Sequence, residues 1–311
     1  MTVQAWACGS VRCASSSQAS SSGRFGGRGS DSDEQDRTID FGFRQVPRGS
    51  KEHLVGEVFR SVASNYDVMN DFMSGGLHRV WKDRLVQKLR PFPSMQHVDV
   101  AGGTGDVAFR ILRAMRESRG GRRGQEADAT AAAFGSGIAA PRPARGSVTV
   151  VDINGSMLAE GRRRAVAQGL DPVDLEWVEA SAEKLPLADA SQDSYTVSFG
   201  IRNVTDRAAA LREAHRVLRP GGRFLCLEFS KVEESIPGLQ QIYDAYSFHV
   251  IPAIGKLVAG DQDSYQYLVE SIRMFPDQET WAQQIEDAGF KGVEYENLSF
   301  GVVAIHSGLK L

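Results

Sequence analysis

The chain has 311 residues, of which 41% are hydrophobic and 24% charged, so it can form one large domain or two small ones. Its net charge of −3 argues against a nucleic-acid partner. Its three cysteines, Cys8, Cys13 and Cys226, are too few and too scattered for a disulfide framework or a Cys-x-x-Cys metal site. No window reaches about 18 apolar residues, so we expect no membrane-spanning helix.

The first thirty residues differ in composition from the rest. Arg12, Arg24 and Arg28 stand among many serines, and no acidic residue precedes Asp31. Such a segment is typical of a mitochondrial transit peptide, and the alternative is a plain disordered tail. We predict a transit peptide and disordered leader over residues 1–40 and a folded domain over 52–311.

Residues 52–90 predict an N-terminal helical lid. Four apolar residues recur at helical spacing and form one face of a helix: Val55, Val58, Phe59 and Val62. A helix that only caps the sheet would explain this part. It would not explain the following stretch YDVMNDFMSGGLHRVW, which predicts a wall of a substrate site with His78, Arg79 and Trp81 as its most reactive members.

The segment VDVAGGTGD, residues 98–106, predicts a strand, a tight turn and a helix start, as in the cofactor loop of a Rossmann-like sheet. Gly103, Gly105 and Ala108 fit the dinucleotide pattern G-x-G-x-x-G/A. Asp106 at the helix start would, however, repel a pyrophosphate, whereas it suits the ammonium and sulfonium of S-adenosylmethionine. A methyltransferase is therefore favoured over an oxidoreductase. The predicted cofactor contacts here are Gly102, Gly103, Thr104 and Gly105.

Residues 118–146 are rich in Arg, Gly and Ala and predict a flexible surface insertion. Without these 29 residues, Asp152 lies 21 positions after Gly102. That is close to the roughly 20 expected of an acidic residue that binds ribose hydroxyls at the end of a second strand. Asp152 can also cap the helix that follows, and the two roles are compatible.

Three further strands are predicted, in LEWVEA, QDSYTVSF and RFLCLEFS. Ligands of open α/β sheets bind beyond the strand ends, so Arg202 is expected to face the ligand; its alternative role is a salt bridge that holds its loop. Cys226 is expected in the core and Glu228 in the pocket wall. Residues 239–260 are predicted either to pack in the core or to line a hydrophobic channel or contact the bilayer surface.

Two long signatures carry a family resemblance. They are Tyr66-Asp67-Val68-Met69-Asn70 followed by Ser74, His78 and Trp81, and the stretch RVLRPGGRFLCLEFS at 216–230. Both resemble the UbiE-type ubiquinone/menaquinone C-methyltransferases. The similarity runs from about Glu57 to the last residue. The motifs HRVWKD, DVAGGTGD, FGIRNVT, GDQDSYQYLVESIR and VAIHSGLKL are most similar to the eukaryotic, mitochondrial branch.

The resemblance implies a class I S-adenosylmethionine-dependent methyltransferase fold, an α/β structure whose seven-stranded, mostly parallel sheet has helices on both faces. It implies methyl transfer to a ring carbon of 2-methoxy-6-polyprenyl-1,4-benzoquinol in ubiquinone biosynthesis. It implies adenine contacts at Ser181 and Ala182, where the family commonly has an acidic residue at the position of Ser181. It also implies a homodimer or a multi-subunit complex, bound peripherally on the matrix side of the mitochondrial inner membrane.

The reaction suggests roles for a few residues. A quinol ring carbon becomes nucleophilic when a neighbouring phenol loses its proton, so a base or water relay is needed, and His78 and Tyr246 are candidates. A structural His78 packed on Trp81 is the alternative. Arg202 stays protonated and would stabilise the phenolate. The histidines show no metal-ligand spacing, so we predict no metal site.

Three functions remain open at this point. They are quinol C-methylation, a dinucleotide-dependent oxidoreductase, and a non-catalytic scaffold subunit of a quinone-synthesis complex.

Overall fold

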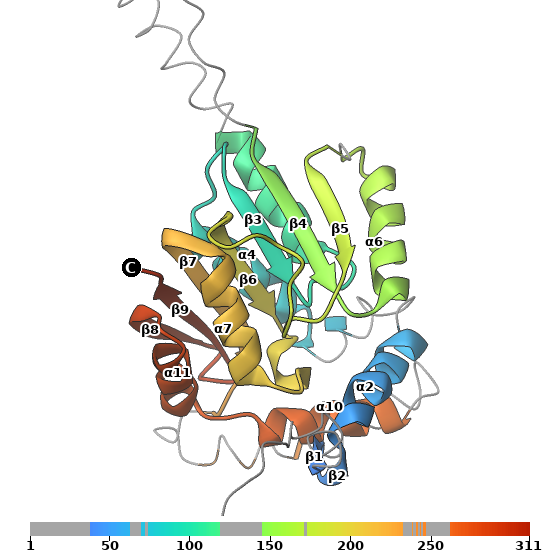
Figure 1. The fold of residues 1–311 in the computed structure, drawn as a ribbon. Coiled ribbons are helices and arrows are strands. Elements are labelled where there is room, and N and C mark those ends of the chain that lie inside the picture. The colour runs from blue at the N-terminus through green and yellow to red at the C-terminus, as the bar shows by residue number, and fades with distance from the viewer. Residues whose placement is uncertain are drawn as a thin grey trace, which may run out of the picture.

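The computed structural model of the protein describes residues 38–62, 70–71, 74–118, 145–170, 173–232 and 262–311, and the single positions 238, 241, 243, 245 and 246. Its centre is a seven-stranded sheet in the order β5-β4-β3-β6-β7-β9-β8 (Figure 1). Neighbouring strands from β5 to β7 pair in parallel, and β9 is antiparallel to β7 and β8. The predicted fold class is confirmed. The strand bounds are β3 Gln96–Val100, β4 Ser147–Asp152, β5 Leu175–Glu179, β6 Gln192–Ser198, β7 Leu218–Phe229, β8 Lys291–Leu298 and β9 Val303–Leu309.

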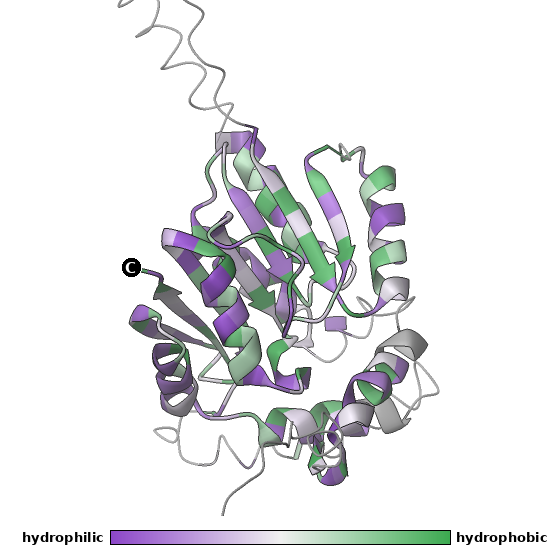
Figure 2. Cartoon of the chain, in the orientation of Figure 1, coloured by the Kyte–Doolittle hydropathy of each residue, from purple (hydrophilic) through white to green (hydrophobic). Residues whose placement is uncertain are grey.

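The central strands are buried along nearly their whole length. In β3 and β4 every residue between the first and the last is buried, whereas the edge strand β8 is largely half-buried or exposed. Parallel strands covered on both faces read as continuous apolar runs rather than as alternating patterns. β4 (SVTVVD) comes near this pattern, whereas β3 (QHVDV) also buries His97 and Asp99, and Figure 2 shows hydrophilic and hydrophobic residues along the strands as well as along the helices. Cys226 is fully buried in β7, as predicted.

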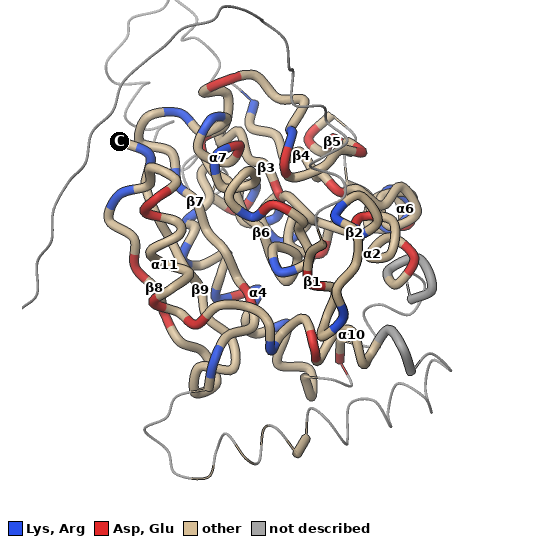
Figure 3. Tube along the Cα trace, turned by 60° about the horizontal axis from the view of Figure 1, so that its bottom comes forward, with Lys and Arg blue, Asp and Glu red and all other residues tan. Residues whose placement is uncertain are grey.

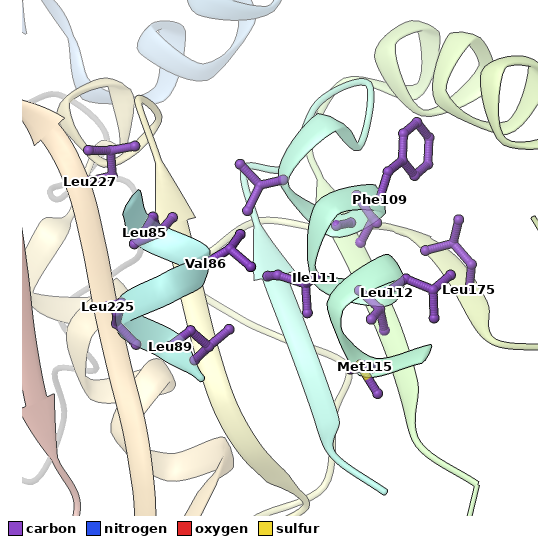
Figure 4. Close-up of a cluster of buried hydrophobic side chains, with 14 of the residues drawn as sticks. Leu85, Val86, Leu89, Phe109, Ile111, Leu112, Met115, Leu175, Leu225 and Leu227 are labelled. Atoms are coloured by element: carbon purple, nitrogen blue, oxygen red, sulfur yellow. The ribbon is translucent and has the colours of Figure 1, made fainter. Parts of the chain in front are cut away.

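Helices cover both faces of the sheet. On one face, α4 (Leu77–Leu89), the helix at 106–118 and α6 (Gly155–Ala167) share a core with β4, β5 and β7. Figure 4 shows Leu85 and Leu89 of α4 facing Leu225 and Leu227 of β7, with Ile111 beside them. On the other face, α7 (Arg207–Val217) and α11 (Gln278–Asp287) pack on β3, β6 and β7.

A third group of elements lies across the end of the sheet where the parallel strands finish (Figures 1 and 3). It consists of the hairpin β1 (Thr38–Phe41) and β2 (Arg44–Pro47), α2 (Arg48–Val62) and α10 (Gln262–Met274). The Phe41 ring stacks on Tyr267 of α10 at a centroid distance of 4.2 Å. Arg48 pairs with Asp206 at 2.8 Å, which ties α2 to the sheet domain.

This group corrects the predicted boundaries. β1 begins at Thr38, inside the predicted leader, and α2 begins at Arg48, before the predicted domain start at 52. The sequence of the hairpin shows no strong alternation of polar and apolar residues. The structure instead shows it stacked on α10 through Phe41 and Tyr267. Residues 1–37 and 119–144, which hold the predicted transit peptide and most of the predicted insertion, lie outside the described residues. Among those described, no helix combines the length and hydropathy needed to cross a bilayer.

The residues Pro220-Gly221-Gly222 lie inside β7, although the strand predicted in RFLCLEFS begins only at Arg223. Gln192 pairs with Leu218 and Ser194 with Arg223, so extra residues of β7 bulge out between the two pairs. Gly221 has a φ of +80°, and its N–H donates to the Lys310 carbonyl at 2.6 Å. The strand therefore starts before the glycines rather than after them.

A buried histidine makes the stability of this fold pH-dependent. His97 of β3 is fully buried, contacts Ser194 Oγ at 2.7 Å and Thr196 Oγ1 at 3.0 Å, and burial lowers its pKa to about 3. The unfolded histidine gains a proton below pH 6.5 and the folded one does not, so His97 costs stability as pH falls. Glutamine cannot gain a proton, so His97→Gln lacks this loss. The difference in the free energy of unfolding between the wild type and His97→Gln should therefore become smaller by about 2 kcal/mol when the pH falls from 7 to 5.

Urea unfolding of both proteins at the two pH values measures this gap. His53→Gln, at an exposed position, is the matched control and should change the gap far less. A gap for His97→Gln that is constant with pH would contradict the neutral, buried state of His97.

Candidate cofactor and substrate site

A pocket with about 770 Å³ of empty volume lies at the end of the parallel strands. Its walls come from the segments that follow β3, β4, β5 and β6, and from α2, which closes it from outside the sheet. This is the position that the topology of an open α/β sheet predicts for a ligand site.

The glycine-rich loop after β3 forms one wall. Gly103 lines the pocket with a φ of +54°, and its N–H donates to Asp152 Oδ2 at 2.8 Å. The Gly105 N–H donates to the Gly102 carbonyl at 2.9 Å, which closes the turn before the helix at 106–118. Of the four predicted contacts in this loop, Gly103 is therefore the one that faces this pocket.

The other three loop residues have different surroundings. Gly102 and Thr104 line a second, smaller cavity beside the pocket, with about 390 Å³ of empty volume. The Thr104 hydroxyl accepts a long hydrogen bond of 3.5 Å from Arg164 of α6. Gly105 packs against the Trp177 ring, so its role is to let the loop lie close to β5 and α6.

That packing makes Gly105 intolerant of a side chain. A Cβ there would lie 2.7 Å from the Trp177 ring, and the φ of +81° is unfavourable for other residues. We expect Gly105→Ala to lower the free energy of unfolding by about 3 kcal/mol. Gly169→Ala is the control, since Gly169 has a similar φ of +64° but open space around it, and should cost about 1 kcal/mol. Equal losses in urea unfolding would show that crowding at Gly105 is unimportant.

Asp152 stands at the end of β4, half-buried in the pocket wall. Its Oδ2 accepts the Gly103 N–H and its Oδ1 the Asn154 N–H, both at 2.8 Å. Burial raises the pKa of Asp152, and these two hydrogen bonds oppose that effect. Each carboxylate oxygen can accept a second hydrogen bond, as from a ribose hydroxyl.

The alternative role of Asp152 as a helix cap is wrong. The cap of α6 is Asn154, whose Oδ1 accepts the N–H groups of Ser156 at 3.0 Å and Met157 at 3.3 Å. Asp152 instead joins the loops that follow β3 and β4.

Ser181 and Ala182 line the pocket after β5, as predicted. The Ser181 hydroxyl donates to Glu52 Oε1 of α2 at 3.2 Å and accepts the Glu183 N–H at 3.3 Å. Glu52 is a pocket residue that sequence analysis missed, because its only signal is the packing of α2 over this loop.

The smaller cavity holds charged residues that sequence analysis also missed. Lys82 of α4 pairs with Asp106 at 2.9 Å, and Arg110 contacts the same carboxylate at 3.2 Å. Two cations thus neutralise Asp106 in this structure, and its predicted place beside the methionine part of S-adenosylmethionine stays a prediction.

Two other groups in this cavity lack partners. Asp99 Oδ2 and Ser198 Oγ are buried without a hydrogen bond within the described structure, and both residues line the cavity. Burial raises the pKa of Asp99 to about 7. Unsatisfied buried polar atoms beside a glycine loop suit the charged amino-acid end of a ligand.

Arg202 lies in the 3-10 turn η2 (Ile201–Asn203), 6% exposed. Its guanidinium donates to Glu228 Oε1 at 2.9 Å and to Ser271 Oγ of α10 at 3.3 Å, and it lies 5.5 Å from the centroid of the Phe229 ring. The salt bridge foreseen as its alternative role is present, while a contact with substrate stays a prediction. Glu228, expected in the pocket wall, is instead buried against Arg202.

His78 is the second residue of α4 and is 4% exposed. Its Nε2 contacts Asp71 Oδ1 at 2.8 Å, and its Nδ1 is buried without a hydrogen-bond partner in the described residues. Burial lowers the pKa of His78, which favours the neutral imidazole that a base requires. Asp71 is thus the hydrogen-bonded neighbour of His78, while the Trp81 indole donates to Ser299 Oγ at 2.9 Å, and packing of His78 on Trp81 stays a prediction.

Tyr246, the other candidate base, is half-buried, and most of segment 239–260 around it lies outside the described residues. In the part of the chain that is described, no three His, Cys, Asp or Glu side chains come together as metal ligands.

Curated proteins are similar to the chain in sequence over most of its length. The ubiE/COQ5 methyltransferase family matches residues 36–310. The mitochondrial 2-methoxy-6-polyprenyl-1,4-benzoquinol methylase of Oryza sativa subsp. japonica is 55% identical over 87% of this chain and 88% of its own. The ubiquinone/menaquinone biosynthesis C-methyltransferase UbiE of Brucella anthropi is 54% identical over 87% of this chain and 92% of its own.

Solved structures share the fold at low identity. A SAM-dependent methyltransferase from Thermotoga maritima has a TM-score of 0.50 at 17% identity, with 82% of this chain and all of that chain covered. The [4+2]-cyclase SpnF has a TM-score of 0.54 at 16% identity, covering 83% of this chain and 96% of its own.

Proposed function

The chain belongs to the ubiE/COQ5 methyltransferase family, and on that premise we propose that it methylates a ring carbon of 2-methoxy-6-polyprenyl-1,4-benzoquinol with S-adenosylmethionine. The substrate is taken from the names of relatives such as the rice methylase, to which the chain is similar over 87% of its length. The observation that carries the proposal is the pocket in which Gly103 and Asp152 meet beyond the strand ends.

The pocket and the adjoining cavity suit different parts of S-adenosylmethionine. The pocket offers Asp152 to the ribose and the segment at Ser181 and Ala182 to the adenine. The adjoining cavity offers Asp99 and Ser198, whose unpartnered oxygens suit the methionine ammonium and carboxylate. When bound, this cofactor supplies an electrophilic methyl group on a sulfonium.

The chain's own residues prepare the quinol. His78 donates from Nε2 to Asp71, which leaves Nδ1 as the acceptor for the phenol proton. Arg202, held in place by Glu228, contributes a fixed positive charge for the developing phenolate. α2, α10 and the β1–β2 hairpin lie across the strand ends and limit access of water to the reacting groups (Figure 1).

The cellular setting is part of the same proposal. A mitochondrial location is supported by the names of relatives in rice and cattle and by the Arg- and Ser-bearing, acid-free start of the chain. Peripheral attachment to the matrix side of the inner membrane, a homodimer, and membership in a multi-subunit coenzyme Q complex rest on the family resemblance.

Calorimetric titration of the protein with S-adenosylmethionine, S-adenosylhomocysteine and NADH tests the proposal. Micromolar binding of the first two, without binding of NADH, is the expected result. Binding of NADH alone would revive the oxidoreductase alternative. Binding of none of them would favour the non-catalytic scaffold alternative.

A further inference from the structure

The end of the pocket next to β5 carries a carboxylate from outside the sheet domain. Glu52, on α2, lines the pocket together with Ser181 and Ala182, and its Oε1 accepts the Ser181 hydroxyl at 3.2 Å. Among the described residues no cation lies within ion-pair distance of this carboxylate. Glu52 therefore retains acceptor capacity for a ligand.

The position of Glu52 relative to Asp152 indicates which part of a ligand it meets. Asp152, the proposed ribose ligand, ends β4, while Ser181 follows β5, the neighbouring strand at the sheet edge. A base attached to that ribose extends toward β5. Ile153, Val55 and Ala182 supply apolar walls there, as a planar aromatic ring requires.

The other carboxylate at this end is half-buried and faces the backbone of a neighbouring loop. Glu183 Oε1 accepts the Asp206 N–H at 2.8 Å, and the negative charge of nearby Glu52 adds to burial in raising the pKa of Glu183. Glu52 differs from Glu183 in that its hydrogen-bond partner, the Ser181 hydroxyl, belongs to the pocket wall itself.

We propose that Glu52 recognises the exocyclic amino group of the adenine and so selects adenine over a base with a carbonyl at that position. The inference rests on the proposed function and adds to it the residue that determines base specificity. A carboxylate accepts hydrogen bonds from an amino group and repels a carbonyl oxygen, so one contact both attracts the correct base and rejects the wrong one.

α2 holds Glu52 in place through contacts on both sides of it in sequence. Arg48 pairs with Asp206 at 2.8 Å, and the Gly56 carbonyl accepts the Asn154 side-chain amide at 3.4 Å. Glu52 lies between these anchors, and its exposed side chain is held by the hydrogen bond from the Ser181 hydroxyl. A fixed acceptor contributes more to specificity than a mobile one.

The test compares S-adenosylhomocysteine with S-inosylhomocysteine, in which a carbonyl replaces the amino group, by calorimetric titration of the full chain. The wild type should bind the adenosyl compound about 10-fold more tightly or better. Glu52→Ala should weaken S-adenosylhomocysteine about 10-fold and leave S-inosylhomocysteine unchanged or improved, so that the preference nearly vanishes. Glu52→Gln, whose amide can both donate and accept, should also lose the preference.

Glu57→Ala is the matched control. Glu57 is an exposed glutamate on the same helix, lies 3.8 Å from His53 and does not line the pocket, so its removal should leave both affinities unchanged. Equal weakening of both compounds by Glu52→Ala, or no change in either, would overturn the inference while leaving the proposed function intact. A wild type that binds neither compound would instead overturn the proposed function, and this inference with it.

Discussion

Replacing Asp152 by alanine is expected to weaken S-adenosylmethionine binding by about 100-fold or more. The variant removes the acceptor for the ribose hydroxyls and also the carboxylate that holds the Gly103 and Asn154 N–H groups at 2.8 Å. Hydrogen bonds to a charged, partly buried acceptor contribute about 1.5–3 kcal/mol each, and two of them suffice for this loss. Calorimetric titration measures the change.

Asp277→Ala provides the matched control for Asp152. Asp277 also accepts a backbone N–H, that of Thr280 at 2.8 Å, but it caps α11 away from the pocket. Its removal should leave cofactor affinity unchanged. An Asp152→Ala protein that binds S-adenosylmethionine as tightly as the wild type would contradict the assignment of the ribose site.

Breaking the buried pair of Arg202 and Glu228 is expected to have the largest effect on stability. The two side chains are 4% and 1% exposed, so removing one leaves the other charge buried and unpaired. Arg202→Met should lower the free energy of unfolding by about 3–5 kcal/mol. The double variant Arg202→Met/Glu228→Leu, which leaves no buried charge, should recover most of that loss in urea unfolding.

The same double variant separates structure from catalysis. If Arg202 stabilises the phenolate, the refolded double variant should bind S-adenosylhomocysteine normally and transfer methyl groups at least about 100-fold more slowly. A stable double variant with wild-type activity would show that Arg202 only holds its loop.

The fold was largely predictable because short strands rich in β-branched and aromatic residues alternate with glycine turns and amphipathic helices. The two features that sequence analysis placed wrongly depend on tertiary contacts. The β1–β2 hairpin exists through the stack of Phe41 on Tyr267, and β7 starts early because Gly221 bonds to the Lys310 carbonyl. Neither contact leaves a periodic signal in the sequence.

The site was predictable where a residue type coincides with a strand end. Asp152, Ser181 and Ala182 follow predicted strands, and the structure places all three in the pocket. Glu52 was missed because an exposed glutamate on a helix has no local mark of function. The ion pair of Asp106 with Lys82 was not predicted, because Lys82 comes from a helix that precedes the glycine-rich loop and only tertiary packing brings it to Asp106.

The most direct test of the account is methyl transfer from S-adenosylmethionine labelled in its methyl group. The protein would be incubated with 2-methoxy-6-polyprenyl-1,4-benzoquinol kept reduced, and in parallel with the oxidised quinone. If the chain methylates the quinol, label should appear on a ring carbon of the quinol and none on the quinone, which has no phenol proton to lose. An unlabelled quinol, or equal labelling of both oxidation states, would contradict it.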